Sequence, residues 1–519
     1  MNIHRMASPS PLDRRRFVRL SAGSLAAVAA GCGRVENRGY SRGSTIIVGV
    51  PGSDSQVLNP TPHSDHPFWL VFLPLMALNE RGELEGRLAE RWELSPDYWE
   101  RTYYLRPGVR WHDGVPVTAQ DIKFSIELLN NPDVLEFGEL LSVTVLNDQT
   151  VKIRFRSSSY YELREIQYPK HLLELLDTKQ FWNWDFWKHP VGNGPYRVVR
   201  HVPETMMEFE VNPDYYGGRP SIERVVVKFV GGAGLTALLA GEVDAISRID
   251  PAWIPTLAAD ARFQLYHSPS STYAGLFWQH RDPLFRDARV RRALTLAIDR
   301  RGLLQLARFP GDSPLADGPM TERQFRRGEF DESLPYDPEQ ARALLEAAGW
   351  HDRNGLRERE GLAFRFTALV PQSSFYQQMA VYIQAQLRRV GVEMDVQMRA
   401  DVVGRIRSGE FQAAFDRADF GHLTYTLSGG DSFEFAGSYQ NARVIELVKR
   451  AETTANPDVQ DQIYTDLRVI FREDVPLTYL IPFTRFSVAH RSIRGLSSPW
   501  RIDPLRFMED LWLEEERGS

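Results

Sequence analysis

Residues 105–121 read LRPGVRWHDGVPVTAQD, and this stretch decides the fold. The Asp113-Gly114 pair predicts a tight turn. Thr118 and Asp121 have the spacing of a capping box, in which a hydroxyl and a carboxylate satisfy free backbone N–H groups, so we expect a helix to begin there. Apolar residues then recur over 122–129. The stretch therefore predicts a strand, a turn and a capped helix in direct succession.

Further strands are expected on both sides of this stretch. Residues 101–105 and 109–111 are separated by Pro107-Gly108, and we predict that these two runs pair with each other. Other runs with strand character are 46–50, 150–155, 208–211 and 223–230. The last of them ends in glycines that open a predicted helix over 235–240.

The second half of the chain is richer in predicted helices. One is expected over 288–306, and another begins at Asp337-Pro338 and ends at Gly349. A β-α-β unit follows, made of a strand over 364–370, a helix over 376–390 and a strand over 392–398. The expected fold class is therefore α/β, with mixed sheets covered by helices and with a second lobe.

Length and composition agree with a large globular protein. The chain has 519 residues, beyond the roughly 250–300 at which one hydrophobic core stops growing. Its residues are 43% hydrophobic and 25% charged, which is ordinary for a folded protein. The net charge is −6 and no long basic run occurs outside the N-terminus, so nucleic acid is not an expected partner.

The N-terminus has the pattern of an export signal. Arg14-Arg15, a spacer and Phe17 precede the uncharged residues 20–30, which are too few to span a bilayer. This arrangement resembles a twin-arginine signal, whose passengers cross the membrane folded. A basic disordered start is the alternative interpretation.

Cys32 is the single cysteine of the chain and follows Ala29-Ala30-Gly31, which resembles a lipobox. We predict that residues 1–31 are a lipoprotein signal peptide, that Cys32 carries the lipid, and that residues 32–44 are a flexible tether. Cleavage would remove five arginines and one aspartate, leaving a mature net charge of −10.

No complete catalytic or phosphate-binding motif is present in the sequence. Residues 192–195, GNGP, favour a structural turn over a phosphate loop. The His63–His66 stretch could offer two imidazoles and a carboxylate to a metal, although solvated loop residues explain it better. Three tryptophans lie within 182–187, where core packing or a lobe contact is favoured over a platform for stacking a sugar or an aromatic ligand. We therefore expect neither an enzyme nor a cofactor.

A series of motifs spans residues 45–510 in a fixed order. They lie at 58–60, 82–84, 88–93, 95–97, 105–121, 191–196, 212–220, 237–244, 285–294, 297–300 and 336–350. Together they resemble extracellular solute-binding protein family 5, which includes the oligopeptide-, dipeptide- and nickel-binding receptors of ABC importers.

The resemblance implies a two-lobed periplasmic-binding-protein fold with a hinge, in which the lobes close over a ligand. Lobe I would comprise residues 45–268 and the return segment 487–519, and lobe II residues 269–486. The implied function is a lipid-anchored receptor on the periplasmic side of the cell envelope. It would bind a peptide or similar solute and deliver it to a membrane ABC permease, and a monomer is expected.

Peptide-binding relatives usually carry a Gly-Trp-x-x-Asp-Tyr-x-Asp-Pro-like stretch in lobe II. The corresponding segment here is 414–423, in which only the acid Asp419 and the aromatic Phe420 match. The resemblance implies that Asp419 pairs with the α-ammonium group of the ligand.

Neighbouring residues leave alternatives open for this segment. Asp416 could share the role of Asp419, and Arg417 could neutralise either acid and leave a polar cleft suited to a sugar. A solvated ion pair on a surface loop is a further interpretation. Trp278 and Gln279 stand where many relatives have Phe-Asn at the entry to the cleft, so they are also predicted ligand contacts.

Peptide is the default ligand, with an oligosaccharide or a metal chelate as alternatives. A hydrolase recruited onto the same scaffold and an interaction or chaperone-like protein with a degenerate cleft are the alternatives from other classes.

Overall fold

The structure is a computed structural model that describes residues 44–52, 67–134, 140–155, 167–330, 333–419 and 438–514. These residues belong to one unit, Ser44–Glu514. The predicted signal peptide, Cys32 and the predicted tether up to Gly43 lie outside the described residues.

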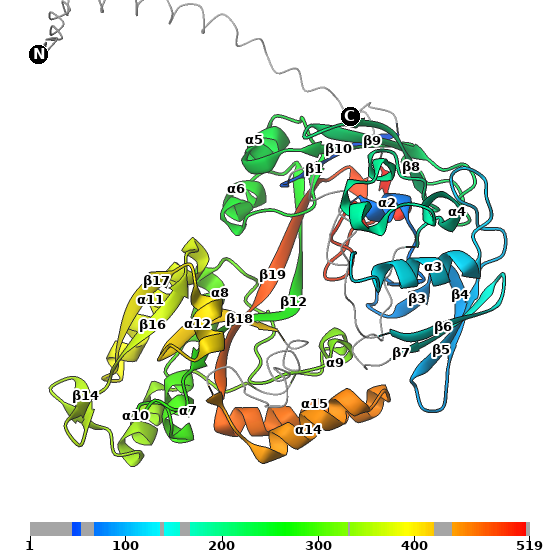
Figure 1. The fold of residues 1–519 in the computed structure, drawn as a ribbon. Helices are drawn as coiled ribbons and strands as arrows, with labels where there is room; N and C mark the ends of the chain where they lie inside the picture. Colours follow the sequence, from blue (N-terminus) through cyan, green and yellow to red (C-terminus); the bar gives the residue numbers. More distant parts are fainter. Residues whose placement is uncertain are drawn as a thin grey trace, which may run out of the picture. The chain divides into compact units, whose positions relative to one another are not determined.

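Ten strands form the largest sheet of the unit (Figure 1). In spatial order they are β17 (Glu393–Arg399), β16 (Arg365–Pro371), β18 (Ala413–Asp419), β12 (Phe263–Trp278), β19 (Leu477–His490), β11 (Ala245–Ile246), β1 (Thr45–Val50), β10 (Arg224–Phe229), β9 (Met206–Val211) and β8 (Tyr196–Val202). Parallel and antiparallel pairs both occur, so the prediction of a mixed sheet is confirmed.

The two longest strands, β12 and β19, connect the two ends of this sheet. They pair antiparallel, from Phe263 opposite His490 to Phe277 opposite Leu477. At one end β11 adds to β19, and at the other β18 adds to β12 through residues 272–278. β12 and β19, with 16 and 14 residues, therefore join two groups of shorter strands. One group is β17, β16 and β18, and the other is β11, β1, β10, β9 and β8.

The pairing of β12 with β19 is interrupted near its middle. The register shifts between Pro269 and Tyr273, opposite Thr484 and Pro482, and shifts again at Ala274 and Gly275. Irregularities of this kind bend a strand and redirect its side chains. Phe483 lies opposite the first shift, where no residue of β12 is in register with it.

A four-stranded antiparallel sheet holds the predicted strand-turn-helix stretch. Its order is β4 (Ala89–Leu94), β5 (Glu100–Leu105), β7 (Thr150–Phe155) and β6 (Leu140–Asn147). Helix α3 (Ala119–Leu129) packs against it. The capping box is confirmed, because the Thr118 N–H donates to the Asp121 carboxylate at 2.8 Å and the Thr118 hydroxyl accepts from the first turn.

One prediction in this region is wrong. Residues 109–111 do not pair with 101–105, which instead pairs with β4 and β7. Residues 109–117 fold back on themselves, with Trp111 N–H donating to Val115 O at 2.8 Å. Both edges of β5 are already paired, with β4 and β7, so Val109 and Trp111 instead bury their side chains in the core from a tight loop.

The predicted β-α-β unit of the second half is confirmed as β16, α11 (Ser374–Arg389) and β17. The predicted helix over 288–306 is two helices, α7 (Ala288–Leu296) and α8 (Arg300–Leu306). The break occurs at Asp299, whose carboxylate accepts the Gly302 N–H at 2.8 Å and thereby caps a new helix.

The remaining elements are short or peripheral. The other helices are α2 (Phe68–Val71), α4 (Lys170–Leu173), α5 (Gly234–Leu239), α6 (Ile254–Ala258), α9 (Glu322–Arg327), α10 (Pro338–Ala347), α12 (Val402–Ser408), α14 (Ala442–Thr453) and α15 (Pro457–Asp474). Three small sheets contain β2 (Met76–Leu78) with β3 (Leu84–Gly86), β13 (His351–Arg353) with β14 (Leu356–Arg359) and β15 (Leu362–Ala363), and β20 (Ile493–Arg494) with β21 (Trp512–Leu513).

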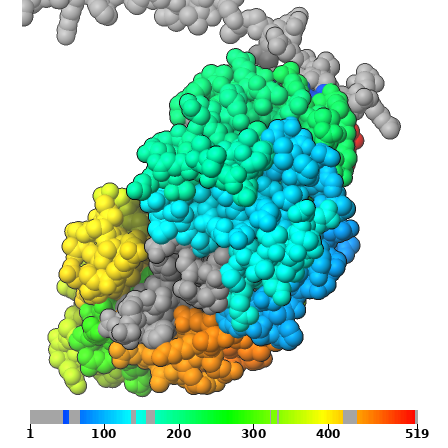
Figure 2. Space-filling model, turned by 45° about the vertical axis from the view of Figure 1, so that its right-hand side comes forward, coloured from blue at the N-terminus to red at the C-terminus, as the bar shows by residue number. Residues whose placement is uncertain are grey.

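Buried side chains form three clusters rather than one. The first collects residues from Ile46 to Val227 and from Ala489 to Leu511. The other two are built mainly from residues 237–488. Figure 2 shows one face of the molecule, on which the blue to blue-green segments lie together and the yellow segment that contains β16 and β17 lies at the left. Residues 237–257, which were predicted in lobe I, contribute to the second cluster.

The GNGP stretch packs directly on a backbone segment next to α2. Asn193 and Gly194 both donate their N–H groups to Val71 O, at 3.0 and 2.7 Å. The Asn193 side chain accepts the Leu73 N–H at 2.8 Å. A Cβ on Gly192 would overlap the Val71 carbonyl. The stretch is thus a structural turn in which glycine permits close approach of two backbones.

We predict that Gly192→Ala lowers the free energy of unfolding by about 3 kcal/mol or more, because the Val71 backbone must move and its hydrogen bonds weaken. Denaturant unfolding measures the loss. Gly232→Ala is the matched control, since nothing lies within 4 Å of its Cβ position, and its effect should stay below about 1 kcal/mol. Equal stability of the two variants would contradict this account of the turn.

Candidate functional site

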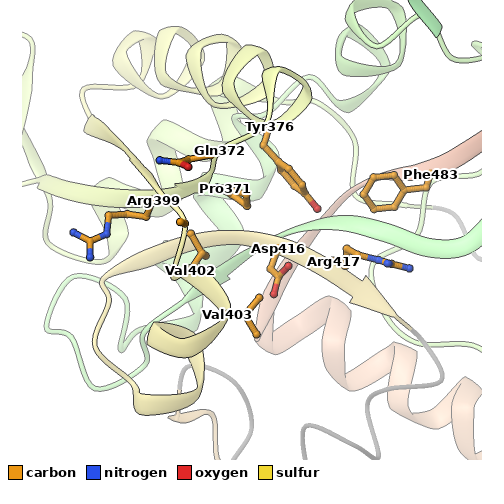
Figure 3. Close-up of a pocket in the computed structure, with 10 residues that line it drawn as sticks. Pro371, Gln372, Tyr376, Arg399, Val402, Val403, Asp416, Arg417 and Phe483 are labelled. Carbon is orange, nitrogen blue, oxygen red and sulfur yellow. The ribbon is translucent and has the colours of Figure 1, made fainter. Parts of the chain in front are cut away.

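A pocket of about 500 Å³ opens where the parallel strands β16, β17 and β18 end. Its lining residues are Pro371, Gln372, Tyr376, Arg399, Ala400, Val402, Val403, Asp416, Arg417 and Phe483 (Figure 3). In open α/β sheets, ligands bind in the crevice at the carboxyl ends of the strands. The position and the volume are those of a small-molecule site.

Apolar side chains form most of the pocket wall. Val402 and Val403 come from the start of α12 and Pro371 from the end of β16. The Phe483 ring lies 5.5 Å from Phe375 and 6.4 Å from Tyr376, so the aromatic wall is itself supported by packing. Phe483 faces the pocket at the interruption of the β12–β19 register.

Asp416 supplies a carboxylate to this apolar pocket. Its residue is half-buried, and burial raises the pKa of its carboxyl, while the backbone N–H of Arg417 and the charges of Arg417 and Arg407 act in the opposite direction. Within the described part of the chain, Asp416 forms no ion pair. The charges of Arg417 and Arg407 therefore act on its ionised form only from beyond ion-pair distance, and they offset the cost of burial only in part.

Tyr376 points its hydroxyl into the pocket from the first turn of α11, toward Asp416 (Figure 3). The residue is 8% exposed, and its hydroxyl has no hydrogen-bond partner among the described residues. Burial raises the pKa of Tyr376, and the charge of Asp416 raises it further, so the phenol keeps its proton at neutral pH. The pocket thus contains a hydrogen-bond donor that no described residue accepts from.

Two arginines lie at the rim and direct their guanidinium groups away from Asp416 (Figure 3). Arg399 forms two hydrogen bonds with Asp401, of 2.8 and 2.9 Å. Arg417 is exposed and lies over the Phe483 ring, 5.9 Å from its centroid.

The structure brings together part of the predicted site. Asp416 and Arg417, both on β18, line the pocket with residues from five other elements, β16, α11, β17, α12 and β19. For Asp419 the structure describes the backbone, which pairs with Thr272 at the end of β18, and not the side chain. Phe420 lies outside the described residues, so the roles of these two residues stay predictions.

Trp278 and Gln279 are not among the residues that line the pocket. The Trp278 side chain is fully buried, packs against Phe285 and donates its indole N–H to Thr478 at 3.2 Å. The Gln279 amide donates to Gly409 O at 3.0 Å. A ligand contact by either side chain would first have to break these bonds.

Other sequence candidates give no binding site in the described structure. Trp184 and Trp187 stack at 6.2 Å in the first core cluster, as core packing predicts, while Trp182 is 41% exposed. The His63–His66 stretch lies outside the described residues. Within the described residues, no group of three or more His, Cys, Asp or Glu side chains could hold a metal ion.

Sequence reasoning missed most of the pocket wall, including Tyr376 and Phe483. A signal was available for part of it: the predicted strands over 364–370 and 392–398 belong to a β-α-β unit, so the residues after them should meet at one sheet edge. No comparable signal marks Phe483, because its position depends on a register shift.

The chain belongs to a family of bacterial extracellular solute-binding proteins. Residues 83–424 match the family model described as bacterial extracellular solute-binding proteins, family 5 Middle. The resemblance seen in the motifs is therefore confirmed, and so is the fold expected from it, since solved structures of similar fold cover nine-tenths of the chain.

Several individual proteins are similar to this chain. A Brucella ovis protein, named for peptide binding by an ABC transporter, is 28% identical over 359 residues, and the match covers 66% of each chain, just under two thirds. The structure of NikZ from Campylobacter jejuni with Ni(L-His) has a TM-score of 0.69 at 24% identity and covers 90% of this chain and 99% of its own. The oligopeptide-binding protein AppA of Bacillus subtilis, solved with a nonapeptide, has a TM-score of 0.66 at 23% identity and covers 91% and 99%.

Among the described residues, no helix combines the length and the apolar character needed to cross a membrane.

We predict that Asp416→Asn raises the free energy of unfolding of the ligand-free protein by about 0.5–1 kcal/mol at pH 7. Because burial raises the pKa of Asp416, its ionised form costs stability at every pH above that pKa, and asparagine removes the charge. Denaturant unfolding at pH 7 measures the gain. Asp395→Asn, an exposed carboxylate on β17, is the control and should change little; a clear loss of stability in Asp416→Asn would contradict the unpaired state.

Proposed function

We propose that this protein is the substrate-binding receptor of an ABC importer, and that it binds a peptide or similar small solute and delivers it to the membrane permease. One observation carries the proposal: at the carboxyl ends of three parallel strands in a family 5 fold, a pocket holds a carboxylate without an ion pair and a hydroxyl without a hydrogen-bond partner among the described residues. The relatives named for peptide binding support peptide as the first ligand class to test.

The ligand would lie between two lobes, with lobe I formed by residues 45–268 and 487–519 and lobe II by 269–486. The separate core clusters support this division, although residues 237–257 pack with the second cluster. The hinge would lie in β12 and β19, near the interrupted register at Pro269–Tyr273.

The proposed role is binding without catalysis. The family consists of solute-binding proteins, and the described residues that line the pocket include no serine, threonine, cysteine, lysine or histidine to form a nucleophile–base pair. A recruited hydrolase would need such a pair, so a hydrolysis assay on every ligand that binds is the direct check.

Asp419 is the proposed partner of the ligand's ammonium group, with Arg417 and Asp416 beside it. We predict that Asp419→Asn weakens binding of an unmodified tripeptide by roughly 2–5 kcal/mol and barely changes binding of the N-acetylated form. Titration calorimetry measures both affinities. At a ligand concentration of about 100 Kd, binding should also stabilise the wild-type fold by about 2.7 kcal/mol.

Asp395→Asn serves as the control for a general loss of negative charge. Equal losses for both peptides would show that Asp419 does not contact the amine. Binding of oligosaccharides or metal chelates instead of any peptide would overturn the peptide assignment and keep the receptor role.

The export route is the second part of the proposal: Arg14-Arg15 direct folded export and Cys32 carries a lipid that holds the protein at the periplasmic side of a membrane. We predict that Cys32→Ser moves the protein from the membrane fraction to the soluble envelope fraction or blocks maturation. Replacing both arginines by lysine should retain it in the cytoplasm. Fractionation and immunoblotting measure both outcomes, and unchanged membrane attachment of Cys32→Ser would refute the anchor.

A further inference from the structure

We propose that the pocket at the ends of β16, β17 and β18 is a selectivity subsite for a cationic group on an aliphatic stem, such as the side chain of a lysine or an alkylammonium ligand. The inference rests on the proposed function only in taking this pocket as part of the ligand-binding site. It adds the chemical class of group that the pocket selects.

The shape and the walls suit a stem rather than a small ion. A volume of about 500 Å³ is far larger than an ammonium group requires, and Pro371, Val402, Val403 and Phe483 give it apolar sides. Methylene groups of a lysine-like stem bury favourably against such walls while the charged end reaches a polar group.

Asp416 provides the polar end. The carboxylate is half-buried and, among the described residues, forms no ion pair; the backbone N–H of Arg417 is the hydrogen-bond donor that lowers its pKa. Burying an ionised carboxylate costs free energy unless a cation pairs with it. An ammonium group bound at this position would therefore gain the electrostatic attraction of a close ion pair with Asp416.

Tyr376 is the second and independent observation. Its hydroxyl is buried, has no partner among the described residues and points toward Asp416 (Figure 3). As acceptor it can receive one N–H of an ammonium or guanidinium group, and as donor it can hold the carboxylate in place. A buried hydroxyl without a partner is rare in native proteins, and a ligand group that completes it explains its position.

Neither of the two arginines at the rim forms an ion pair with Asp416. Arg399 is neutralised by Asp401, and Arg417 lies over Phe483. They also do not favour an anionic ligand inside the pocket, because Asp416 contributes a negative charge to its lining. A neutral sugar would leave the carboxylate uncompensated and would place hydroxyls against valines.

The test uses alanine tripeptides in which one position at a time carries lysine or norleucine, which has the same stem without the ammonium group. For the wild-type protein we expect the lysine peptide to bind at least tenfold more tightly than its norleucine partner at one position. Asp416→Asn should reduce this ratio to about twofold or less and leave the norleucine affinity within about twofold. Tyr376→Phe should reduce the ratio several-fold.

The exposed Asp395 supplies the matched control, because Asp395→Asn removes the same charge from β17, which β16 separates from β18, and should keep the wild-type ratio. The ratio should also persist in 0.5 M salt, which screens long-range attraction. The subsite proposal is wrong if the lysine and norleucine peptides bind equally tightly at all three positions, or if Asp416→Asn leaves their affinity ratio unchanged. Neither result would contradict the receptor role.

If no tripeptide binds, the peptide part of the proposed function fails, and the subsite is tested alone with n-pentylamine and agmatine followed by NMR. Binding of either to the wild type and its loss in Asp416→Asn supports the subsite. No binding of either to the wild type overturns it.

Discussion

The hydrogen-bonded ladder between β12 and β19 is the constraint on which the rest of the structure depends. On one side of it lie β17, β16 and β18, and on the other lie β11, β1, β10, β9 and β8, so the ladder is the link that joins both groups in one sheet. β11 adds to β19 at Val488 and Ala489, and β18 adds to β12 from Thr272 to Trp278. A change in the register of this one pair would displace both groups, because every neighbouring strand takes its position from it.

The pocket is a consequence of that ladder. Pairing with β12 fixes β18, which brings Asp416 to the edge where β16 and β17 end. The interruption of the ladder at Pro269–Tyr273 leaves Phe483 out of register, and its side chain closes the aromatic side of the pocket. The same irregular backbone is where bending of the two long strands is easiest, so binding and lobe movement would share one structural element.

Some buried polar groups of the core are paired within the protein, whereas others, such as the indole N–H groups of Trp111 and Trp350, have no partner among the described residues. In the core, Arg300 pairs with Asp317 and donates to three backbone carbonyls, and His112 contacts the Gly194 carbonyl while burial lowers its pKa to about 4. In the pocket, Asp416 forms no ion pair with any described residue, and the Tyr376 hydroxyl has no hydrogen-bond partner among them. Satisfied polar groups stabilise the fold, whereas unsatisfied ones cost stability and provide binding energy to a ligand that completes them.

The local elements and the family could be predicted from the amino-acid sequence. The capping box at Thr118, the strands of the β-α-β unit and the ordered motifs all depend on neighbouring residues, whose physical chemistry is readable without tertiary contacts. The predicted pairing of residues 109–111 is wrong because Val109 and Trp111 are buried in the core. The predicted single helix over 288–306 is wrong because the Asp299 carboxylate caps a second helix. The tertiary structure alone decided that Tyr376, Asp416 and Phe483 meet in one pocket and that Trp278 is buried in the core. These residues are far apart in the chain, and only strand pairing and register, which a single sequence does not encode locally, bring them together or keep them apart.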